Sequence, residues 1–168
     1  MRGCTEVITL LNAQVDPDTG YDVYTPTKIT GVSWYSTAAA TVTTSGLLAA
    51  DQYTVRIPVD ADFSGKGYVN PIAYKTADPA KSFTIQRGDV IVRGTIDTPS
   101  RITAADLSRL IGSDGSYIAF TPPDPTATTV DTITPASVQQ TCPDVFTVLS
   151  ITDNRKAPHA QHWKVIGK

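Results

Sequence analysis

Glutamate is almost missing from this chain of 168 residues, in which 16 side chains are acidic and only Glu6 is a glutamate. Leucine and lysine are also scarce. Because glutamate, leucine and lysine are among the residues that most often fill α-helices, their scarcity excludes a helical bundle.

Cysteine and histidine are scarce as well, with Cys 2 and His 2 in the chain. Cys4 and Cys142 lie far apart and cannot by themselves define a disulfide framework or a zinc site, so we expect free thiols in a reducing cytoplasm. His159 and His162 form an H-x-x-H pair with no third ligand at a recognisable spacing. The pattern therefore favours surface or interface histidines over a metal site.

Motifs that would indicate catalysis or a cofactor are also missing. No Gly-x-Ser-x-Gly elbow is present, and the SGKG stretch at 64–67 lacks both the P-loop frame and a following helix. Asp60 and Asp62 lack the ligand pattern of a calcium loop. We therefore expect no enzyme activity, no catalytic residues, no cofactor and no metal.

No apolar run is long enough to cross a membrane, and the stretch at 7–11 is too short and too polar at its flanks for a signal peptide. The net charge of -2 argues against a protein that coats nucleic acid. The last segment, 151–168, is locally basic because it holds four Lys or Arg and one Asp. Such a segment is a solvated end, or it contacts an acidic partner or nearby DNA.

The residues that are abundant favour strands and turns. The chain holds 25 Thr, 12 Pro and 11 Gly. In the stretch 52–60, Tyr53, Val55, Ile57 and Val59 alternate with polar residues, which predicts a strand with one buried face. Pro58 falls on the other, solvent-facing side and predicts an edge strand or a bulge. Further strands are expected at 8–11, 32–35, 90–92, 145–151 and 162–165, with 145–151 covered on both sides.

Helix is expected in two short places. Thr103 can cap a helix over 103–110, with Asp106 in the capping-box position, and a helical turn is expected at 71–74. Residues 113–143 form a Pro/Thr-rich insert, and 121–143 hold five Pro and few large apolar residues, so this insert cannot fold alone. The chain is thus predicted to be one mainly β domain over 1–168, a small barrel or sandwich with long loops.

The most plausible functional residues are polar and aromatic side chains in the predicted loops, where they can contact a partner. Arginine there can bind a carboxylate or phosphate through two hydrogen bonds. The candidate interface residues are Asp60, Asp62, Lys66, Tyr68, Pro122, Pro123, Pro125, Arg155, Lys156, His159 and His162.

Six blocks of the sequence carry a resemblance. They are ITLLN at 8–12, DTGYDVY at 18–24, GVSWY at 31–35, QYTVRIPVDAD at 52–62, GDVIV at 88–92 and TDNRKAPHAQHWKV at 152–165. Together they resemble a family of small, largely uncharacterised head–tail morphogenesis proteins encoded by tailed phages and prophages of Gram-positive bacteria. The resemblance spans nearly the whole chain except about 113–143.

This resemblance implies a structural virion protein at the head–tail joint. We expect a stopper (head-closure) or neck subunit that forms a homo-oligomeric ring, a hexamer or dodecamer, between the portal–adaptor assembly and the tail. Its partners would be copies of itself, portal or adaptor proteins, and tail-tube or tail-terminator proteins. Non-specific contact with genomic DNA in the channel is a further expectation. The protein would be assembled in the host cytoplasm, with no membrane involved.

Three alternatives stay open on the sequence. Within the same class, the chain could be a tail-terminator or minor tail protein. From another class, it could be a β-sandwich module that binds a carbohydrate. An enzyme is the third alternative, and it predicts that replacing His159 or His162 abolishes a turnover.

Overall fold

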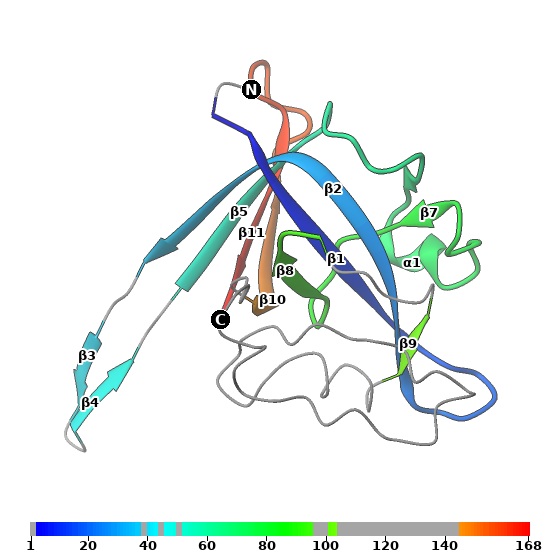
Figure 1. Cartoon of the computed structure of the whole chain (residues 1–168), viewed down its shortest axis with the longest axis horizontal. Coiled ribbons are helices and arrows are strands. Elements are labelled where there is room, and N and C mark those ends of the chain that lie inside the picture. Colours follow the sequence, from blue (N-terminus) through cyan, green and yellow to red (C-terminus); the bar gives the residue numbers. More distant parts are fainter. Residues whose placement is uncertain (1–2, 38–39, 44–45, 50–51, 96–100, 104–144) are drawn as a thin grey trace, which may run out of the picture.

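The computed structural model of this chain describes residues 3–37, 40–43, 46–49, 52–95, 101–103 and 145–168. Within them, a closed six-stranded antiparallel β-barrel forms the body of the molecule (Figure 1). Around the barrel the strands follow the order β1 (Glu6–Val15), β8 (Val90–Arg93), β10 (Val145–Asp153), β11 (His162–Gly167), β5 (Gln52–Pro58) and β2 (Asp22–Thr37). Because β2 pairs back onto β1, the sheet closes. The prediction of a mainly β fold is confirmed, in its barrel form.

The longest strand, β2, closes the barrel by pairing with two different neighbours. Its first part lies along β1, and its last part, from Ser33 to Thr37, lies along β5. Gly31 stands between the two parts with φ +90, next to a register shift at Glu6 and Val7. An extra residue with positive φ, which glycine adopts without strain, bends β2 from one partner to the other.

Shorter elements extend from this barrel. A hairpin of β3 (Ala40–Thr43) and β4 (Gly46–Ala49) follows β2 and reaches away from the barrel (Figure 1). β6 (Gly67–Tyr68) pairs in parallel with β7 (Ser82–Phe83), and β9 (Ile102–Thr103) pairs with the start of β2. Between β6 and β7 lies α1 (Pro71–Tyr74), which Asn70 caps by accepting a hydrogen bond from Ala73 N at 2.8 Å. The predicted helical turn at 71–74 is therefore confirmed.

The barrel interior is filled by apolar side chains from every strand. Its buried cluster includes Ile8, Leu10, Ile29, Val32, Val55, Ile57, Ile91, Phe146, Val148, Trp163 and Val165. Around Phe146 the packing leaves no room for a side chain at Gly167, because a Cβ there would lie 2.0 Å from the Phe146 ring. Burial of this cluster is the main stabilising contribution to the fold.

Two strand predictions were wrong in their details. β5 is an interior strand between β11 and β2, and Pro58 is buried. Its missing N–H is tolerated because pairing with β2 has already ended at Arg56. Val59 is 37% exposed because the chain turns away from the barrel there. In β10, Phe146 and Val148 are buried but Leu149 is 53% exposed, so this strand is covered on one side only.

The predicted helix over 103–110 begins at a residue that lies in a strand. Thr103 pairs with Val23 in β9. The other residues of that helix, 104–110, lie outside the described part of the chain, as do the insert at 113–143 and its candidates Pro122, Pro123 and Pro125. Among the described residues, no helix is long and apolar enough to span a bilayer.

Candidate functional site

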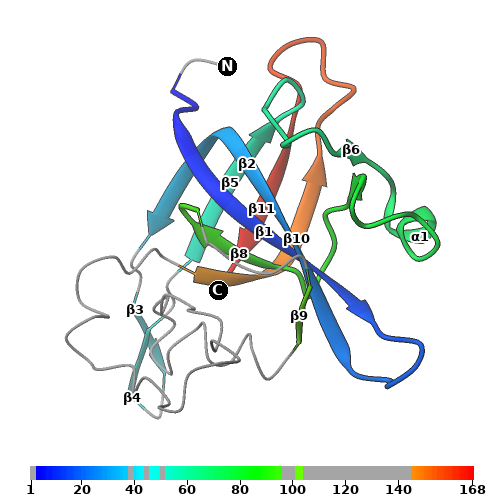
Figure 2. The same ribbon diagram turned by 45° about the vertical axis from the view of Figure 1, so that its right-hand side comes forward.

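The structure brings the described candidate interface residues together in two neighbouring loops. One loop follows β5 and leads into β6, and the other joins β10 to β11. They meet through a backbone hydrogen bond from Val59 N to Gln161 O at 3.2 Å. Both loops lie at the end of the barrel where the N-terminus also lies (Figures 1 and 2). The first loop and β6 carry Asp60, Asp62, Lys66 and Tyr68; the second loop and the start of β11 carry Arg155, Lys156, His159 and His162.

Arg155 holds the two loops together by stacking on aromatic rings. Its Cζ lies 4.5 Å from the centroid of the Tyr68 ring and 5.0 Å from that of Trp163. Asp153 fixes the guanidinium by accepting hydrogen bonds from Nε at 2.9 Å and from Nη2 at 2.7 Å. These side-chain hydrogen bonds raise the pKa of Arg155 and lower that of Asp153. Arg155 is therefore an organiser of this end, and its planar guanidinium suits that position better than a lysine would.

The other charged candidates have fewer partners. Asp60, Lys156 and His159 are exposed. His162 is partly buried, and its Nδ1 lies 2.5 Å from Ala160 O. In the part of the chain that the structure describes, no three His, Cys, Asp or Glu side chains come together as a metal site would require. Cys4 is a free thiol in a partly buried position, and Cys142 lies outside the described residues.

The loop after β5 lies against the outer edge of β2. Asp62 and Thr30 exchange two backbone hydrogen bonds, of 2.9 and 3.0 Å. Ser64 Oγ donates to Lys28 O at 3.0 Å. This loop thus satisfies backbone groups that would otherwise form an open strand edge.

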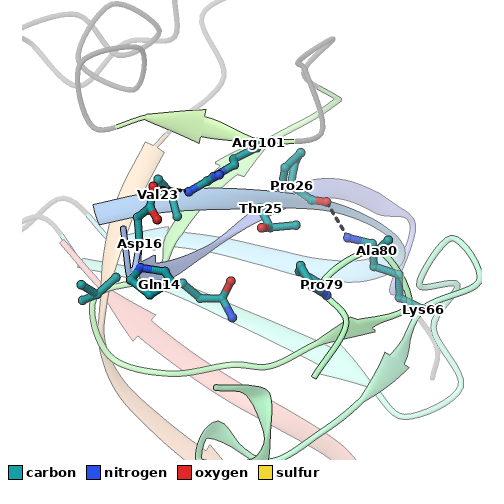
Figure 3. Close-up of a pocket in the computed structure, with 11 residues that line it drawn as sticks. Gln14, Asp16, Val23, Thr25, Pro26, Lys66, Pro79, Ala80 and Arg101 are labelled. Atoms are coloured by element: carbon teal, nitrogen blue, oxygen red, sulfur yellow. Dashed lines mark hydrogen bonds and ion pairs between the residues drawn. The ribbon is translucent and has the colours of Figure 1, made fainter. Parts of the chain in front are cut away.

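Lys66 contacts the same outer edge of β2 nearer the start of the strand, at Pro26, and its side chain lines a pocket. Its Nζ donates to Pro26 O at 2.9 Å (Figure 3) and to Thr27 Oγ1 at 3.1 Å. Proline at position 26 has no N–H to leave unpaired, so a single donor completes the edge there. Partial burial lowers the pKa of Lys66, because desolvation disfavours its charged form.

The pocket has a volume of about 570 Å³ and lies beside the turn between β1 and β2 (Figure 3). Its walls include three prolines and two valines, Pro17, Pro26, Pro79, Val15 and Val23. Arg101 and Asp16 form an ion pair on its far side from Lys66, with Nη2 and Oδ2 2.5 Å apart (Figure 3). The hydrogen bond from the backbone N–H of Asp18 lowers the pKa of Asp16 most, and Thr19 and then Arg101 lower it further. The pocket is therefore apolar on its walls and charged at two ends.

A buried polar network that the sequence analysis missed supports one side of this region. Asp89 is fully buried and accepts hydrogen bonds from Ala13 N, Gln86 N and Asn12 Nδ2, each at 2.9 Å. Asn12 Nδ2 also donates to Thr84 O at 2.7 Å. Burial raises the pKa of Asp89 to about 7, although its hydrogen-bond donors oppose that shift. A signal was present, because Asn12 and Asp89 each interrupt or border an apolar stretch in the sequence.

Comparison with known proteins gives a family without an assigned activity. A family model described as a family of unknown function, DUF6751, matches residues 4–168. No curated protein and no solved structure matches the chain. The site must therefore be interpreted from its own geometry.

Proposed function

We propose that this chain, which belongs to the family of unknown function DUF6751, is a structural virion protein of the phage head–tail joint. In this proposal it is a stopper or neck subunit, and copies of it form a ring between the portal–adaptor assembly and the tail. Its action is mechanical: the barrel is a rigid body, and loops dock on the assemblies above and below it.

The observation that carries the proposal is the placement of two separate projecting surfaces on one closed barrel. The loops with the candidate interface residues lie at one end, and the β3–β4 hairpin extends from the other (Figures 1 and 2). A subunit that joins two different assemblies needs a contact surface toward each of them. This arrangement supports a connecting role, together with the resemblance of the sequence to head–tail morphogenesis proteins.

The chemistry of the loop end also supports docking. Asp60 and Lys156 are exposed on adjacent loops and present both signs of charge, while Arg155 and Tyr68 hold those loops in a fixed arrangement. A preorganised polar surface loses little conformational entropy on binding, and its charges favour one orientation of the partner.

Deletion of the gene in a phage or prophage that carries it tests this proposal. Loss of a stopper leaves filled or leaking heads beside separate, finished tails, whereas loss of a tail terminator gives tails of uncontrolled length. Electron microscopy of the lysate distinguishes these outcomes, and a plasmid copy of the gene should restore joined particles. Intact, infectious particles in the deletion strain would overturn the proposal.

A further inference from the structure

The outer face of strands β5 and β11 carries two cations side by side. Val55 and Ile57 of β5 point into the barrel, so Arg56 between them points outward. Lys164 of β11 alternates with buried residues in the same way and lies directly opposite Arg56 in the antiparallel register. Like charges in directly opposite positions repel each other. An anion bound over this pair would therefore stabilise the face.

Neither cation is neutralised by a described carboxylate. In the part of the chain that the structure describes, Arg56 and Lys164 form no ion pair. Their other cross-strand neighbours, Ser33 of β2 and Thr152 of β10, are uncharged. Arg56 Cζ lies 5.4 Å from the centroid of the Tyr35 ring, and Tyr35 is 51% exposed. We call the surface formed by Tyr35, Arg56 and Lys164 the basic face.

The turn between β1 and β2 has the opposite charge. Asp18 and Asp22 are exposed, and neither forms an ion pair with any described residue. Tyr21 lies between them in the sequence and is 75% exposed. An exposed ring beside carboxylates is complementary to an exposed ring beside cations. We call the surface formed by Asp18, Tyr21 and Asp22 the acidic turn.

The shape of the acidic turn is fixed by Asp16. Its Oδ1 accepts a hydrogen bond from Asp18 N at 3.0 Å, and its backbone O accepts one from Gly20 N at 2.8 Å. Asp16 N donates to Tyr21 O at 2.9 Å. Arg101 pairs with the Asp16 carboxylate, which is thereby already occupied. A turn with a fixed shape loses little conformational entropy when a partner binds it.

The acidic turn and the basic face lie on opposite sides of the barrel. Strand β2 begins at Asp22 and carries Tyr35 near its other end, and its 16 residues extend for roughly 50 Å along the strand. In both views the turn extends on the side away from β5 (Figures 1 and 2). Two complementary surfaces on opposite sides of a subunit join copies head to tail, and such a contact can repeat around a ring.

We propose that the basic face binds the acidic turn of a second copy of this chain. The two carboxylates of the turn pair with the two cations of the face, and the ring of Tyr21 lies against that of Tyr35. This contact supplies the lateral interface of the proposed ring, and its place in a particle rests on that proposed function. Its test uses the purified chain, so failure of the contact is distinguishable from failure of the role in a phage.

Exchange of the charges between the two surfaces tests the contact. The turn variant carries Asp18→Lys and Asp22→Lys, and the face variant carries Arg56→Glu and Lys164→Glu. In sedimentation velocity, we expect the wild type to associate and each variant alone to associate at least about tenfold more weakly, because its turn and its face then carry the same charge. An equal mixture of the two variants should associate as the wild type does, since the turn of each is complementary to the face of the other.

The control variant carries Lys28→Glu and Lys81→Glu, which change the same number of charges as the face variant at exposed positions outside both surfaces. It should associate like the wild type. A wild type that stays monomeric up to about 1 mM, or a mixture that associates no better than its components, would overturn the proposal. Unfolding temperatures show whether the variants fold. If the face variant does not, Lys164→Glu mixed with Asp22→Lys is measured instead, with the same outcomes.

Nucleic acid is the competing occupant of the basic face, because phosphates bind Lys and Arg and bases stack on aromatic rings. Fluorescence anisotropy with a labelled single-stranded oligonucleotide tests it on the same samples. We expect the face variant and the control variant to bind the oligonucleotide equally. If the face variant binds it at least about tenfold more weakly than the control while the wild type stays monomeric, the face is a nucleic-acid surface and the proposal is wrong.

Discussion

The guanidinium carbon of Arg155 lies 4.5 Å from the centroid of the Tyr68 ring, and through this contact one loop of the barrel end rests on another. The two residues are 87 positions apart, yet they belong to one surface. Asp153 fixes the arginine from its own loop, and Trp163 provides a second ring at 5.0 Å. The loop end is thus a defined structure before any partner binds.

Replacing this arginine should loosen the loop end and lower stability modestly. For Arg155→Ala we expect a loss of about 1 kcal/mol in the free energy of unfolding, because a partly exposed cation–π contact and ion pair contribute on this order. Lys156→Ala is the matched control, since Lys156 is exposed and lacks these contacts. Urea unfolding checks both variants. Equal losses for the two would contradict the organising role of Arg155.

Ionisation of Asp89 should make the fold less stable as pH rises. Burial raises the pKa of Asp89 in the folded chain to about 7 from an ordinary value of 3.8. Between these values the folded state binds the extra proton, so its contribution to stability is full below about pH 4 and is lost as pH rises through 7. We expect the unfolding free energy of wild type, relative to Asp89→Asn, to fall between pH 5 and pH 8.

The Asn variant also reports on the hydrogen bonds of Asp89. The Asn amide carries two hydrogens where the protonated carboxyl carries one, and Ala13 N, Gln86 N and Asn12 Nδ2 all donate to this position, so at pH 5 we expect Asp89→Asn to cost about 1–3 kcal/mol. Comparing the two proteins at each pH subtracts the titration of every other group. A difference that grows with pH would show that the donors from Ala13, Gln86 and Asn12 outweigh burial, contrary to this expectation.

Gly167 should not tolerate even a methyl group. A Cβ there would lie 2.0 Å from Phe146 Cδ2 and 2.3 Å from Thr147 O, so the strand or the ring must move. We expect Gly167→Ala to destabilise the barrel by about 3 kcal/mol. Gly67→Ala is the control, because nothing lies within 4 Å of its added methyl group, and its effect should be within about 0.5 kcal/mol. Thermal unfolding that ranks the two variants alike would disprove the close packing at Gly167.

Charge reversal on the exposed loops should impair particle assembly without changing the fold. Lys156→Glu alters a side chain at the proposed docking end, while Lys81→Glu alters an exposed lysine elsewhere on the molecule. In a complemented deletion strain, we expect at least a tenfold lower yield of joined particles for the first variant than for the second. Similar unfolding temperatures would confirm that both variants fold, and similar yields would argue against docking through this loop.

Much of the barrel could be predicted because its strands have local signals. The alternation around Val55 and Ile57 and the pair Trp163 and Val165 identify buried faces directly. The β3–β4 hairpin was missed because its Ala-, Thr- and Gly-rich sequence has little alternation of apolar and polar residues. Pro58 was predicted to face solvent but is buried, because whether the end of a strand is covered depends on the segments that pack there, which a local pattern does not contain.

For the candidate surfaces, too, the residues could be identified from the sequence but their contacts could not. Loop chemistry indicated Tyr68 and Arg155 separately, but only the closure of the barrel places one on the other. The pocket beside the β1–β2 turn could not be predicted, because residues that line it come from segments far apart in the sequence, such as Val15, Lys66 and Arg101. The sequence indicated which residue types have suitable chemistry, whereas the register of the strands determines which of those side chains come into contact.

Cryo-electron microscopy of intact particles from a phage that encodes this chain tests its proposed place most directly. The account predicts a symmetric ring of six or twelve copies of this barrel at the neck, with the loops that carry Arg155 and Lys156 against one neighbouring assembly and the β3–β4 hairpins toward the other. Particles whose neck contains no density for this barrel, or that carry it only elsewhere, would contradict the account.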